Sequence, residues 1–95
     1  MIRCFKLEDG SLFPPTCFND MFARFADLRE FQMTESDVGV FQVDVELAPG
    51  VPDREDTLRR MQSHIQSTIP GSPAVHIRNA SFGADSKFQR YRSNL

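Results

Sequence analysis

Two histidines are the side chains best suited to acid–base chemistry in this chain of 95 residues. A histidine changes its charge near neutral pH, so it can serve as a general acid, a general base or a metal ligand. His64 lies among apolar residues with helical spacing, whereas His76 alternates with Val75 and Ile77 as an outward-facing strand residue would. Histidines at such positions more often have a structural role. We retain His76 as a catalytic candidate because Arg78 would share its polar face.

The other reactive side chains give weaker signals. Asp44 and Glu46 stand two residues apart on one expected strand, where paired carboxylates can do acid–base work, although such pairs are more often solvated or paired with arginine. Cys4 and Cys17 each stand alone, without the spacing of a zinc site. The sequence contains no nucleophile elbow, glycine-rich phosphate loop or metal-binding helix motif. We therefore predict no metal site.

Composition restricts the class of protein. Apolar residues make up 40% and charged residues 25%, which is typical of a globular domain. The net charge of −2 lacks the basic footprint of a nucleic-acid-binding protein. The sequence has no apolar run long enough for a signal peptide or a membrane span, so we expect a cytoplasmic protein with reduced cysteines and no membrane partner.

Apolar spacing and turn residues predict the elements that would position these side chains. Apolar residues at i, i+3, i+4 and i+7 predict a helix over 16–26 with Thr16 as N-cap, and a second stripe predicts a helix over 53–68 with Asp53 as N-cap. Asp9-Gly10 between short apolar runs predicts an N-terminal hairpin. The remaining expected segments are strands over 28–34, 40–47 and 74–78, a polar turn over 35–39 and an irregular tail over 79–95.

This order of elements predicts one domain over residues 1–95. We expect an α+β fold, a two-layer ferredoxin-like sandwich in which two helices cover one face of a small, mostly antiparallel sheet. An N-terminal hairpin and an irregular C-terminal tail would flank it.

Two segments of the chain resemble the C-terminal lid domain of phenylacetate-CoA ligase-like adenylate-forming enzymes, in the acyl-CoA synthetase superfamily. Residues 7–15 resemble the loop that opens that domain, with Gly10 at its turn glycine and Phe13-Pro14-Pro15 at its apolar–proline step. Residues 86–91, Ser-Lys-Phe-Gln-Arg-Tyr, resemble its closing motif. Ser86 replaces the family's usual glycine. With the elements between them, the two motifs extend the resemblance over nearly the whole chain.

The resemblance implies roles for particular residues. Lys87 would enter the active site and stabilise charge while the acyl adenylate forms. Gly10 would lie near the channel for the pantetheine arm, where the absence of a side chain lets a thiol tether pass close to the backbone. We add two arginines as candidates for substrate binding: Arg78, beside His76, and Arg90, in the second motif.

The resemblance also implies a partner. In these ligases a large N-terminal domain binds ATP and the carboxylic acid, so we expect that this chain cannot adenylate an acid alone. ATP and coenzyme A, or the pantetheine of an acyl carrier, would come through an ATP-binding ligase domain in trans or through the carrier. Two other hypotheses remain: a repurposed enzyme acting alone on acyl or polyketide thioesters as a hydrolase or cyclase, and a non-catalytic module for binding or homodimerisation.

Overall fold

The computed structural model describes residues 4–71, 73–83 and 90–94. The chain begins with the predicted hairpin, in which β1 (Phe5–Lys6) pairs antiparallel with β2 (Leu12–Phe13). Its turn is closed by Asp9, whose Oδ1 accepts hydrogen bonds from the Ser11 backbone N–H (2.9 Å) and hydroxyl (2.6 Å). Gly10 follows with φ of 86°, a value that glycine adopts without steric cost.

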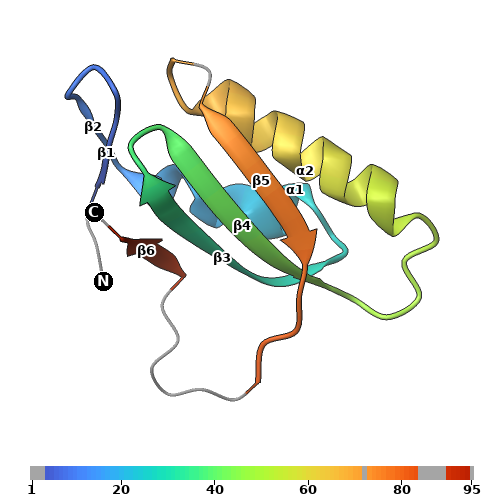
Figure 1. The fold of residues 1–95 in the computed structure, drawn as a ribbon. Helices are drawn as coiled ribbons and strands as arrows, with labels where there is room; N and C mark the ends of the chain where they lie inside the picture. The colour runs from blue at the N-terminus through green and yellow to red at the C-terminus, as the bar shows by residue number, and fades with distance from the viewer. Residues whose placement is uncertain (1–3, 72, 84–89, 95) are drawn as a thin grey trace.

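A four-stranded sheet forms the centre of the molecule, with strand order β5-β4-β3-β6 (Figure 1). Its central pair is an antiparallel hairpin of β3 (Leu28–Asp37) and β4 (Val40–Leu47). On one side β5 (Ala74–Asn79) runs parallel to β4, and on the other β6 (Tyr91–Ser93) runs parallel to β3.

The α+β prediction is confirmed, and the strand directions refine it. The expected antiparallel pairing holds for the central pair and the N-terminal hairpin, whereas both outer pairs of the sheet are parallel. The reason for the β5 pairing is the connection: α2 returns the chain to the end of the sheet where β4 began, so the next strand must run in the same direction. The N-terminal hairpin forms a separate small sheet.

The second helix agrees closely with its prediction. α2 spans Arg54–Thr68, and the Asp53 side chain caps it by accepting a hydrogen bond from the Asp56 backbone N–H at 3.0 Å. The first helical segment differs, because a 3-10 helix, η1 (Pro15–Asp20), precedes a single α-helical turn, α1 (Met21–Arg24). η1 starts from Pro14 with no side-chain cap, so the expected N-cap role of Thr16 is wrong. The consecutive prolines fix the backbone there two residues earlier, at Pro14.

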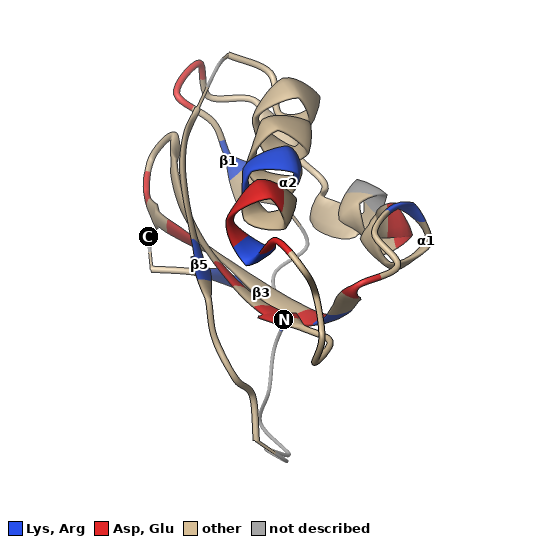
Figure 2. Ribbon diagram, turned by 90° about the vertical axis from the view of Figure 1, so that its right-hand side faces the viewer, with Lys and Arg blue, Asp and Glu red and all other residues tan. Residues whose placement is uncertain are grey.

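The apolar core fills the space between the helices and one face of the sheet. Figure 2 shows α1 and α2 on the same side of the sheet. Alternate residues of the central strands point into this layer, and Phe31, Met33, Phe41, Val43 and Val45 are fully buried there. The opposite face of the sheet has no helix over it among the described residues, which leaves the polar residues of the same strands open to solvent.

Two segments are longer or more regular than predicted. β3 extends to Asp37, so Glu35 belongs to a strand instead of the expected polar turn, and it is only 1% exposed. The tail contains β6, where Tyr91 is buried against the core. Three residues are too few to show an alternating pattern in the sequence, which is why the tail was expected to be irregular.

Candidate functional site

The open face of the sheet carries two of the predicted site residues. His76 and Arg78 are both exposed on β5, on the face away from the helices. The strand register places His76 beside Gln42, Gln42 beside Thr34, and Thr34 beside Arg92. These four polar side chains therefore form a row across the whole sheet.

Arg78 lies in the next row of this face and is paired. Its Nε lies 2.5 Å from Oδ1 of Asp44, and its Nη2 lies 3.4 Å from Oδ2. The hydrogen bond from Arg78 to Asp44 and the charge of that carboxylate raise the pKa of Arg78 above its ordinary value. Because the Arg78 side chain is 68% exposed, solvent screens the pair, and another anion can compete for the guanidinium.

Arg90, the other arginine candidate, is held more firmly. Its guanidinium donates to both carboxylate oxygens of Glu30, with Nε–Oε1 at 3.0 Å and Nη2–Oε2 at 3.3 Å. The same guanidinium lies 4.9 Å from the ring centroid of Phe22 and 5.5 Å from that of Phe31. A bidentate ion pair stacked on aromatic rings is a well-ordered arrangement, and it joins the start of β6 to β3.

His64 has an apolar setting on α2. It lies between the rings of Phe18 and Phe25, with ring centroids 6.4 Å and 6.0 Å away. Burial, together with the charge of Arg24, lowers the pKa of His64 below its usual value, so the neutral imidazole is favoured. This environment fits a packing role for His64, as its position in the sequence suggested.

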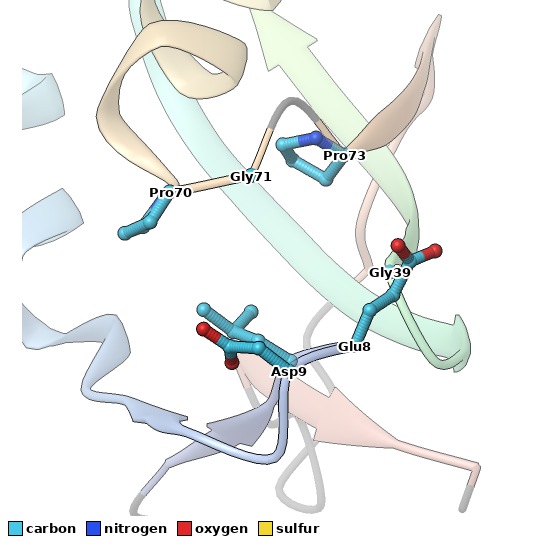
Figure 3. A pocket seen from close by; sticks show the side chains of 7 residues that line it. Glu8, Asp9, Gly39, Pro70, Gly71 and Pro73 are labelled. Carbon is cyan, nitrogen blue, oxygen red and sulfur yellow. The ribbon is translucent and has the colours of Figure 1, made fainter.

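A small pocket lies beside the turn that carries Gly10 (Figure 3). Three connections meet there: the β1–β2 turn, the β3–β4 turn and the link between α2 and β5. The lining residues are Leu7, Glu8, Asp9, Gly39, Pro70, Gly71 and Pro73, around a volume of about 140 Å³. The sequence shows the turn signals of each connection, but it gives no indication that they meet.

One buried carboxylate was missed by the sequence interpretation. Glu35 points to the core side of β3, where its Oε1 accepts from the Lys6 backbone N–H at 3.3 Å and from the Ser93 hydroxyl at 3.5 Å. Its Oε2 has no hydrogen-bond partner among the described residues. Burial raises the pKa of Glu35, and the two hydrogen bonds offset part of that effect. The alternation Phe31, Met33, Glu35 is the signal that could have found it.

Lys87, the predicted catalytic lysine, lies outside the described residues. The described chain leaves β5 after Asn79 and returns at Arg90. The pocket lies at the opposite end of β5, next to Pro73. A strand of six residues is roughly 20 Å long, so the described chain leaves β5, at Asn79, roughly 20 Å from the pocket.

The described part of the chain has neither a cluster of metal ligands nor a helix that could span a membrane. No three of its histidine, cysteine, aspartate and glutamate side chains are grouped closely enough to hold a metal ion. None of the helices among residues 4–71, 73–83 and 90–94 has the length and apolar character needed to cross a membrane.

Comparison with known proteins identifies the fold. No protein-family model and no curated protein sequence matches the chain. Among solved structures, a domain of phenylacetate-coenzyme A ligase from Bacteroides vulgatus matches with a TM-score of 0.65 and 18% identity. The match covers 96% of this chain and 92% of that domain. This chain has the fold of a phenylacetate-CoA ligase domain.

The match confirms the resemblance seen in the sequence at the level of the fold. It extends over nearly the whole of both chains, so the hairpin, the sheet and both helices take part in it. The roles expected for Lys87, His76, Gly10, Arg78 and Arg90 remain predictions.

Proposed function

We propose that this chain acts as the small mobile domain of an acyl-CoA ligase-type enzyme, together with a separate ATP-binding ligase domain. The observation that carries the proposal is the fold match to a phenylacetate-CoA ligase domain over 96% of the chain, in a sequence with two motifs resembling that family. The substrates would be a carboxylic acid, ATP and coenzyme A or the pantetheine of an acyl carrier.

The two motif segments are proposed to make two separate contributions. The Gly10 turn lies at the end of the sheet where β5 begins, whereas Arg90 and Tyr91 of the second motif lie beside Met33 in the middle of β3. A domain that rotates between two orientations would present them in turn.

Gly10 has the surroundings that a close approach would need. Its φ is 86°, and nothing lies within 4 Å of the position that a Cβ would occupy. The tight turn therefore requires glycine for its backbone, while the space beside it is open. In our proposal the pantetheine arm passes this turn during thioester formation.

The proposal also assigns roles to His76 and to the two paired arginines, Arg78 and Arg90. His76 and Arg78 would face the partner domain or its bound substrate, since both are exposed on the face without helices. Arg90 would have to leave Glu30 and two aromatic rings to bind a substrate directly. Its contacts favour a role in holding β6, and through it the end of the segment that carries Lys87.

The test is reconstitution of acid activation. The chain would be mixed with an ATP-binding ligase domain that lacks its own small domain, and pyrophosphate release would be measured for a panel of carboxylic acids. We expect the chain to stimulate release, and Lys87→Ala to lower the stimulated rate by about 100-fold, the effect typical of losing one charge-stabilising group.

Arg59→Ala, which removes an exposed cation from α2, is the matched control and should retain the wild-type rate. Equal rates for Lys87→Ala and the wild type would rule out the lysine's role. No stimulation by the wild-type chain would contradict the proposed function.

A further inference from the structure

The interior of the pocket beside the Gly10 turn is mainly apolar. Leu7 and Pro73 are buried and form its apolar floor, and Pro70 extends that surface toward solvent. Its volume of about 140 Å³ is close to that of a cavity able to hold a benzene ring, so a short aliphatic chain fits. Three separate connections form the walls, and each contains a positive-φ glycine: Gly10, Gly39 or Gly71.

The charges at the rim of this pocket are negative. Glu8 and Asp9 both line it, and the described lining residues include no lysine or arginine. Two hydrogen bonds from Ser11 lower the pKa of Asp9, so that carboxylate is ionised at neutral pH. Figure 2 shows the turn of this hairpin as an acidic tip.

The Glu8 carboxylate lies against Gly39, and it has no ion-pair partner among the described residues. A Cβ built on Gly39 would lie 2.6 Å from Glu8 Oε1, so the carboxylate rests directly against that glycine. Figure 3 shows the Glu8 side chain rising beside Gly39 at the edge of the pocket. Within the described residues, Glu8 forms no hydrogen bond or salt bridge, which leaves both of its oxygens available to a ligand.

We propose that this pocket binds the side chain of a lysine presented by a partner protein. The four-carbon stem of the lysine packs on Leu7, Pro70 and Pro73, and its ammonium group reaches the Glu8 carboxylate, with Asp9 adding to the local negative potential. A phosphate or carboxylate ligand is disfavoured by the same two charges. The inference does not depend on the ligase function, because any protein that docks on this end of the sheet could supply the lysine.

The choice of lysine over arginine follows from shape. A guanidinium is a broad planar group that binds carboxylates best in a paired, fork-like geometry, whereas an ammonium group is compact and needs one carboxylate at the mouth of a narrow apolar pocket. Here one carboxylate that has no partner among the described residues stands at the rim, and the lining beneath it is apolar.

The experiment is an NMR titration of the 15N-labelled chain with capped tripeptides, Gly-Lys-Gly and the same peptide with norleucine or arginine in place of lysine. The lysine peptide should shift the amide signals of Asp9, Gly39 and Gly71 with millimolar affinity. The norleucine peptide should bind at least about fivefold more weakly, because it lacks the charge, and the arginine peptide should also bind more weakly.

The variant that tests the site is Glu8→Gln, which keeps the shape of the side chain and removes its charge. This variant should bind the lysine peptide about fivefold more weakly than the wild type does. Glu46→Gln, which removes a charge from the polar face of β4, is the matched control and should bind the peptide as the wild type does. Equal shifts with lysine and norleucine peptides, equal affinity in Glu8→Gln, or no shift of the pocket signals would each overturn the proposal.

Discussion

β5 and β6 both run parallel to the strand beside them, yet they are attached to the central hairpin by different means. β5 has six residues, and α2 packs behind it and donates a hydrogen bond from the Gln62 side chain to the Val75 carbonyl at 2.6 Å. β6 has three residues and depends on side-chain contacts, including Arg90 to Glu30 and the Tyr91 hydroxyl to Asn19 at 2.7 Å. β5 is therefore held by its contact with α2, whereas β6 is held by contacts of its side chains.

This difference changes how the two arginine candidates should be understood. Both contact a carboxylate of the central hairpin, so sequence and pairing alone do not distinguish them. Arg78 is 68% exposed, whereas Arg90 is 34% exposed and lies over two aromatic rings. We therefore expect Arg90 to hold its short edge strand, and Arg78, on a strand already fixed by a helix, to contribute little to the fold; substrate binding by either arginine remains a prediction.

The largest expected effect comes from removing the anchor of β6. Arg90→Ala should lower the free energy of unfolding by about 2 kcal/mol, because it leaves Glu30 without its bidentate partner and removes the contacts to Phe22 and Phe31. Arg78→Ala should leave the stability unchanged within error. Urea denaturation followed by circular dichroism measures both values.

Amide hydrogen exchange tests the same comparison separately for each of the two edge strands. In Arg90→Ala, the Asn94 amide, which donates to the Glu35 carbonyl at 2.9 Å, should exchange faster, while the amides of β5 should keep their protection. If both variants lost the same stability, or if exchange rose equally on both strands, the distinction between the two edges would be wrong.

A smaller effect is expected at Glu35, the buried carboxylate between β1, β3 and β6. Burial raises its folded-state pKa above the ordinary 4.5, so the ionised side chain destabilises the fold above that raised pKa. Glu35→Gln should therefore be more stable than the wild type at pH 7.5, by roughly 1 kcal/mol. As the pH falls through the raised pKa toward 4.5, the wild type is protonated and the advantage should shrink.

Urea denaturation of Glu35→Gln and wild type at several pH values from 7.5 to 4.5 measures this trend. An advantage that stays constant with pH would show that protonation of Glu35 does not contribute. A wild type more stable than the variant at pH 7.5 would show that its carboxylate has a favourable partner.

The sequence predicted those parts of the fold in which one periodic pattern is long. The alternation from Val40 to Leu47 and the capped stripe of α2 identified both elements, because burial on a single face leaves a repeating signature. The short first helix and β6 were poorly predicted, since each is stabilised by contacts with distant residues. Tyr91, for example, is fixed by Asn19 and by the aromatic rings of the core.

The candidate site residues also divide into those that a local sequence pattern predicted and those that depend on distant contacts. The exposure of His76 and Arg78 followed from strand alternation, and the pairing of Asp44 with an arginine is one of the two outcomes expected for that carboxylate. The pocket at Glu8 was not predictable, because it depends on three turns that meet only in the folded chain. Glu35 was assigned to a turn because its polar neighbours, Ser36 and Asp37, resemble a loop in composition.

The most direct test of the proposed function is to assay the two half-reactions separately with Gly10→Ala and Lys87→Ala. Pyrophosphate release would report adenylation by the chain with its ligase partner, and thioester formation from a preformed acyl adenylate would report the second step. The account predicts a crossed result: Lys87→Ala loses adenylation and keeps thioester formation, whereas Gly10→Ala keeps adenylation and slows the second step by about tenfold or more. Loss of both half-reactions to the same degree in both variants, with the fold intact, would contradict it.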